Sequence, residues 1–279
     1  MLKTKQIVVV LLVLVLIGTL FARPIKGLVD KDDESSSSNT AENSSSAYNL
    51  ESVSELSKQG VNASLLQDIF ALETKVAKAE GEEKIALYGE LAKKWDDLAK
   101  PIPQGFIFQE MAKISPKFEY YLNAGDAFRA GYTNQQDTAL AAELNRLAIS
   151  AYEEALALDA NSLKAKTGLG AGLVTGSNNP MSGIALLREV VAAEPKNVEA
   201  NKTLGTFSMQ SQQYDKAIER FKTVIEVQPD AETYFYLAAA YVKIGLKNEA
   251  ISAYQKSKEL AADPSLSQYI DRQIEELSK

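Results

Sequence analysis

The residues of this chain that could do chemistry are carboxylates, hydroxyls and lysines, because it contains neither histidine nor cysteine. That absence excludes thiolate nucleophiles, histidine general bases and metal sites built from these residue types. A carboxylate-based hydrolase remains as an alternative, with Asp126, Glu199 and Glu232 as its acidic candidates. Two carboxyl groups must lie about 5 to 10 Å apart for glycoside hydrolysis, and these three belong to separate helical segments. We therefore predict no enzyme and no catalytic residue.

Composition excludes several classes of partner. The chain has 30 basic and 37 acidic residues, a net charge of −7, and its basic residues are spread along the sequence. A nucleic-acid surface needs Lys and Arg gathered on one face. We therefore predict no nucleic-acid partner, no cofactor, no metal and no small-molecule substrate, and we expect a protein or peptide partner instead.

Residues from about 50 onward are predicted to be all-α, because no alternation of period two is sustained. Capping side chains, several followed by proline, indicate helix starts at Asn62, Ser115, Asn179, Asn197, Asp230 and Asp263. Residues 62–100 indicate a helical pair, either a degenerate repeat or, as we favour, an N-terminal cap. Pro101 and Pro103 predict a break after this pair.

A unit of about 34 residues recurs over residues 117–160, 161–196, 197–230 and 231–264. The first unit has an eleven-residue insertion, which predicts a longer second helix. We expect its extra turns to pack on residues 62–100 rather than form a partner surface. Small residues recur at Gly125, Gly170, Gly205 and Ala238, and again at Ala148, Gly183, Ala217 and Ala250. They would let the two helices of each hairpin approach closely, so that stacked hairpins share one core.

The best-formed unit, LGTF followed by YDKAIERFKTVIEVQP, resembles the tetratricopeptide repeat family. The resemblance covers about 150 of the 279 residues and implies a solenoid of about four helical hairpins with a capping helix at residues 265–279. It also implies a groove, lined by the first helix of each hairpin, that binds peptides or partner helices. Carried over by position, the groove residues are Leu122, Asp126, Arg129, Thr167, Lys202, Thr206, Met209, Phe235 and Val242. Leu122 and Asp126 stand where chaperone-binding members carry a Lys and Asn pair, which disfavours a chaperone-tail clamp.

The N-terminal residues predict membrane targeting. Residues 6–22 are uncharged and mostly Val, Leu and Ile, and Ala22 does not follow an A-x-A-like pattern, which favours an uncleaved signal anchor over a cleaved signal peptide. The predicted domains are a transmembrane anchor (1–29), a Ser-rich disordered linker (30–49), an N-terminal helical region (50–116) and the repeat array with its capping helix (117–279).

These features together predict a single-pass membrane protein with a periplasmic or otherwise extracytoplasmic body. Its predicted function is a tethered scaffold or adaptor in the assembly of an envelope complex. A cytosol-facing, co-chaperone-like protein is the alternative within the binding class.

Overall fold

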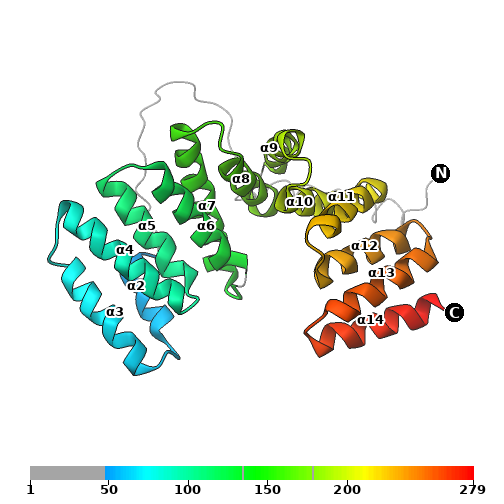
Figure 1. The fold of residues 1–279 in the computed structure, drawn as a ribbon, viewed down its shortest axis with the longest axis horizontal. Coiled ribbons are helices and arrows are strands. Elements are labelled where there is room, and N and C mark those ends of the chain that lie inside the picture. Colours follow the sequence, from blue (N-terminus) through cyan, green and yellow to red (C-terminus); the bar gives the residue numbers. More distant parts are fainter. Residues whose placement is uncertain (1–47, 134, 178) are drawn as a thin grey trace, which may run out of the picture. The chain divides into compact units, whose positions relative to one another are not determined.

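The computed structural model describes residues 48–133, 135–177 and 179–279, which form helices and the short turns between them (Figure 1). The helices of these ranges are α2 (Leu50–Lys58), α3 (Ala63–Val76), α4 (Gly81–Asp97), α5 (Pro101–Ile114), α6 (Phe118–Thr133), α7 (Thr138–Leu158), α8 (Leu163–Gly176), α9 (Pro180–Ala193), α10 (Val198–Gln210), α11 (Tyr214–Val227), α12 (Ala231–Lys243), α13 (Lys247–Leu260) and α14 (Pro264–Leu277). The all-α prediction is confirmed.

Four hairpins occupy the four predicted repeat units. They are α6 with α7, α8 with α9, α10 with α11 and α12 with α13, and each pair is in close contact. The second helix of each hairpin contacts the first helix of the next, and α14 packs on α13 (Figure 1). Because each helix has a neighbour on either side in chain order, the apolar faces are buried by stacking.

Glycines bring the helices of a hairpin close together, as their spacing predicts. A Cβ atom built on Gly183 would lie 2.5 Å from the backbone oxygen of Gly170, on the facing helix. One on Gly205 would lie 2.6 Å from the ring of Phe221, which is fully buried. No side chain fits at these distances, so glycine is required for the observed approach.

The predicted break at Pro101 and Pro103 is wrong, because both residues lie in the first turn of α5. Proline is tolerated there, since the first amides of a helix have no intrahelical partner. The chain instead turns just before Pro101, where Ala99 has a φ of 52°. The predicted helix start at Ser115 is also displaced: Ser115 caps the C-terminus of α5, and α6 begins at Phe118.

The insertion in the first unit extends α7 and packs within the molecule, as predicted, although against other helices than expected. Leu140 and Leu144 are buried in a core shared with Val53 of α2 and Phe106 of α5. Asn145, also buried, donates a hydrogen bond of 3.2 Å to the carbonyl of Gly172 in α8. The added turns therefore link the N-terminal helices to the array.

The predicted location is corrected. Residues 1–29, the predicted anchor, lie outside the described residues, as does the predicted linker up to residue 47. Among the helices of residues 48–279 that the structure describes, no helix combines the length and apolar character needed to cross a bilayer. On this finding the prediction of a single-pass membrane protein with an extracytoplasmic body is wrong.

Candidate partner-binding site

The first helices of the hairpins, α6, α8, α10 and α12, are neighbours, because each contacts the next one in this series. A pocket of about 500 Å³ opens where α6, α8 and α10 meet. Its charged lining includes Asp126 and Arg129 from α6, Lys164 from α8 and Glu199 from α10. Charges of both signs from three successive repeats therefore face one cavity.

Ion pairs cross this pocket from helix to helix. The Lys164 ammonium lies 2.7 Å from Asp126, and Nη1 of Arg129 lies 2.6 Å from Oε1 of Glu199. Tyr152, a fully buried residue of α7, donates a hydrogen bond of 2.7 Å to Oδ1 of Asp126. Its hydroxyl thereby fixes the carboxylate that pairs with Lys164.

The pair of Arg129 and Glu199 is incompletely satisfied. Within the described residues, Nε of Arg129 and Oε1 of Glu199 are buried without a hydrogen-bond partner, so the close approach of Nη1 to Oε1 lacks hydrogen-bond geometry. Buried polar groups are nearly always hydrogen-bonded in native proteins. The pair is therefore held by charge attraction rather than by a well-formed hydrogen bond, and its two side chains keep 33% and 36% of their surface exposed.

Burial controls the protonation of this pair. Burial raises the pKa of Glu199 above its ordinary value, the Arg129 charge lowers it in part, and the Asp126 carboxylate raises it further. Burial also opposes the charge on Arg129, but Glu199, Tyr152 and Tyr132 together more than compensate, so the pKa of that guanidinium is raised. Arginine remains charged in proteins, so the pocket keeps a cation at all ordinary pH values.

A second charged cluster joins α10 to α12. The Lys202 ammonium lies 2.6 Å from Glu232 and 3.7 Å from Asp230, the residue that caps α12. Burial opposes the charge on Lys202, but the two carboxylates more than compensate and raise its pKa. The face of the first helices thus carries paired charges in both halves of the array.

The structure brings together three of the predicted groove residues, since Asp126, Arg129 and Thr167 line the same pocket. Thr167 is nevertheless buried, and its hydroxyl donates to the carbonyl of Leu163. Leu122 is also buried, within the core around α6 and α7. Both therefore contribute more to helix packing than to an exposed surface.

The other predicted groove residues lie in the second half of the array. Thr206 is half-buried and donates to the carbonyl of Thr203, while Met209 and Val242 pack at the edge of the C-terminal core. Phe235 is half-buried, with its ring 5.6 Å from that of Tyr254 and 5.8 Å from that of Tyr269 on α14. Phe235 therefore also holds the capping helix in place.

Sequence reasoning on the first helices alone missed Tyr152, which comes from a second helix. The geometry also bears on the hydrolase alternative, because Asp126 and Glu199 do line one pocket, whereas Glu232 lies in the other cluster. Each of these carboxylates is held in an ion pair with a lysine or arginine. Asp126, Glu199 and Glu232 are therefore part of a surface of paired charges.

Comparison with known proteins supports this interpretation of the repeats. One tetratricopeptide repeat family model matches residues 176–241, and a second matches residues 231–264. Anaphase-promoting complex subunit 3 of Dictyostelium discoideum is 30% identical over 110 residues, which is 39% of this chain and 11% of that protein. The matched region is therefore a small part of that subunit.

Two solved structures show the same fold. A crystal structure of MamA protein is 22% identical with a TM-score of 0.50, and covers 64% of this chain and 92% of that one. MamA from residue 41 to its end, from Desulfovibrio magneticus RS-1, is 20% identical with a TM-score of 0.50, and covers 63% and 94%. At these identities the likeness concerns the fold alone. The hairpins within residues 176–264, α10 with α11 and α12 with α13, therefore match tetratricopeptide repeat models.

Proposed function

We propose that the chain is a non-enzymatic adaptor that binds a segment of a partner protein across α6, α8 and α10. The observation that supports this function is the pocket where three repeats meet, lined by the charged side chains of Asp126, Arg129, Lys164 and Glu199. A polypeptide carries both kinds of complementary group on its backbone. A bound segment could therefore donate to the carboxylates of this lining and accept from its cations.

In this proposal the charges around the pocket determine which partner binds, through charge complementarity more than through the strength of each ion pair. Lys164 keeps 64% of its side chain exposed, so its pair with Asp126 contributes little to stability and can be exchanged for a partner's carboxylate. Charged groups at an interface mainly set specificity and the rate of association. The other predicted positions, Lys202, Thr206, Met209, Phe235 and Val242, extend this surface toward the C-terminus in the proposal.

The more specific prediction, assembly of an envelope complex, depended on a membrane segment and is not carried into this proposal. The adaptor function rests on the repeat array alone. It requires neither a catalytic group nor a cofactor.

Site-specific photocrosslinking of the full chain in cells tests the proposal. A photoreactive residue in place of Lys164 should capture a partner, whereas one in place of the exposed Glu189 on α9 should not. The captured protein should then bind the purified chain and lose affinity at least ~10-fold, about 1.4 kcal/mol, in the double variant R129Q/E199Q. The double variant removes both charges together, so that neither is left unpaired. Unchanged affinity in R129Q/E199Q, at unchanged thermal stability, would contradict the proposed site.

A further inference from the structure

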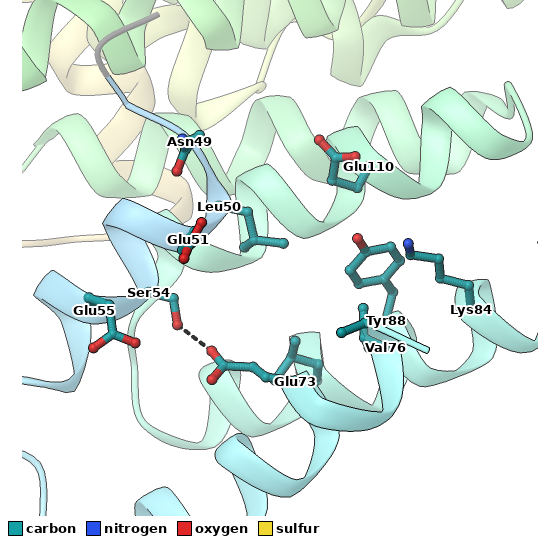
Figure 2. Close-up of a pocket in the computed structure, with 12 residues that line it drawn as sticks. Asn49, Leu50, Glu51, Ser54, Glu55, Glu73, Val76, Lys84, Tyr88 and Glu110 are labelled. Atoms are coloured by element: carbon teal, nitrogen blue, oxygen red, sulfur yellow. Dashed lines mark hydrogen bonds between the residues drawn. The ribbon is translucent and has the colours of Figure 1, made fainter. Parts of the chain in front are cut away.

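We propose a second binding site, outside the repeats, in which the pocket between α2, α3, α4 and α5 takes the side chain of an arginine or lysine from a partner polypeptide (Figure 2). The pocket has a volume of about 500 Å³, within the usual range for sites that enclose a small ligand or side chain. Its helices precede the repeat array, so this inference does not depend on the function proposed for the array.

The walls of the pocket suit a long side chain with an apolar stem. Leu50 of α2, Val76 of α3 and Leu91 of α4 are among its lining residues, and the last two are buried. Lysine and arginine bury their methylene stems along such surfaces and keep the charged group in a polar environment. The apolar part of the lining therefore matches the stem, and the polar part has to match the charge.

Carboxylates dominate the charged lining. Glu51 and Glu55 of α2, Glu73 of α3 and Glu110 of α5 line the pocket together with a single cation, Lys84. Figure 2 shows that these acidic side chains come from three different helices. The lining thus has an excess of negative charge, which favours a cationic ligand.

Some of these carboxylates already form ion pairs, which limits how many are available to a ligand. Lys58, which lies outside the lining, is 2.6 Å from Glu55 and 2.7 Å from Glu73. Glu110 lies 2.6 Å from Lys113, in a pair where the lysine is 62% exposed. Glu51 makes no ion pair with any residue in the described ranges. Glu73 also accepts a hydrogen bond from Ser54, so an incoming cation would meet an unpaired carboxylate at Glu51 and an exposed, exchangeable pair at Glu110.

Tyr88 provides an independent indication of a ligand. Only 5% of this residue is exposed, yet its hydroxyl makes no hydrogen bond within the described part of the chain and points into the pocket toward the side where Glu110 lies (Figure 2). Burial raises the pKa of Tyr88, and the Glu110 charge adds to that effect, so the hydroxyl stays neutral. A neutral phenol can accept an N–H of a guanidinium or ammonium and donate to a carboxylate. The ring already attracts a cation, since the Lys84 ammonium lies 5.9 Å from its centre.

A peptide titration tests the proposal with the full chain. The probe is a fluorescent pentapeptide, blocked at both ends, with one arginine between two leucines, and its control replaces arginine by neutral citrulline. We expect saturable binding of the arginine peptide by fluorescence anisotropy, and binding of the citrulline peptide weaker by at least ~10-fold, as for loss of a charge-assisted hydrogen bond. Tyr88→Phe should weaken arginine-peptide binding by about fivefold, whereas the matched Tyr120→Phe on α6, outside the lining, should leave it unchanged.

Several results would overturn the inference. Absence of saturable binding at millimolar peptide, or equal affinity for the two peptides, excludes a site for a basic side chain. Equal affinities of Tyr88→Phe and Tyr120→Phe, with thermal melts that show both variants folded, exclude the pocket as its location. Peptide binding that appears only when Arg23 and Lys26 are both changed to serine would assign the pocket to the chain's own N-terminal residues instead of a partner.

Discussion

From the close approach of α8 and α9 we predict how two Gly→Ala substitutions change the free energy of unfolding. Alanine at position 183 would place its Cβ 2.5 Å from the backbone oxygen of Gly170 and 2.9 Å from Cβ of Leu173. Alanine at Gly89, in the middle of α4, would meet no atom within 4 Å. The two substitutions make the same chemical change in helices, so their difference isolates the helix–helix contact.

The magnitudes follow from two opposing effects. Alanine is favoured over glycine in a helix by about 1 kcal/mol, so Gly89→Ala should raise the free energy of unfolding by about 0.5 to 1 kcal/mol. Overpacking a tight contact costs about 1 to 3 kcal/mol, and the upper end applies to Gly183 because a backbone oxygen cannot rotate away. After the gain in helix propensity, Gly183→Ala should lower the free energy of unfolding by about 2 kcal/mol.

Urea denaturation followed by circular dichroism measures both variants. Trp95, the single tryptophan, is fully buried in α4 and reports separately on the N-terminal helices. Since repeat arrays can unfold in parts, we expect Gly183→Ala to shift the dichroism transition more than the Trp95 fluorescence transition. Equal shifts of both variants in the stabilising direction would show that α8 and α9 do not approach as closely as described, and would refute the reasoning.

Three further predictions concern buried polar groups. Asn201 is fully buried, donates to the carbonyls of Pro195 at 2.9 Å and Asn197 at 2.8 Å, and accepts from Arg220. Asn201→Ala should therefore cost about 2 to 3 kcal/mol in urea denaturation, and a cost below about 0.5 kcal/mol would contradict these bonds. Lys58→Met should cost roughly 2 kcal/mol, less than for a fully buried pair because Glu73 keeps 27% exposure, and Trp95 fluorescence should detect it; an unchanged urea midpoint would count against the pair. Because the pKa of Glu199 is raised from 4.5 in the folded chain, the folded state binds more protons just above that pH and loses stability as the pH rises. Glu199→Gln should thus gain stability relative to the natural chain between about pH 4 and neutrality, and a difference that does not change with pH would contradict the raised pKa.

The repeats were predictable from the sequence because their signals are local and periodic. Gly170 and Gly183 occur at the spacing that a close hairpin requires, and the structure confirms the contact between them. The helix at Pro101 was not predictable in the same way. A proline can either start a helix or interrupt one, and here the buried side chains of Phe106 and Ile107 draw the segment into the core as α5.

The same distinction, between local periodic signals and tertiary packing, applies to the candidate sites. Family positions placed Asp126 and Arg129 on one face, and both line the pocket of the array. The contribution of Tyr152 depends on packing between hairpins, which spacing along one helix does not specify. The pocket at Tyr88 was not predicted either, because its walls come from four helices outside the periodic part of the chain.

The properties of the pair of Arg129 and Glu199 indicate that stability alone does not explain why these charged residues occur on this face of the array. Burial raises the pKa of Glu199 despite the cation beside it, so the environment on balance disfavours its charge. The pair also leaves a buried donor and a buried acceptor unused within the described residues. Removing only one partner of a buried ion pair is strongly destabilising because it leaves a charge unpaired, whereas R129Q/E199Q removes both charges and should keep the fold. An ion pair that does not contribute to stability is explained if it serves to recognise a partner. The variant R129Q/E199Q should therefore keep the fold and lose affinity for the partner.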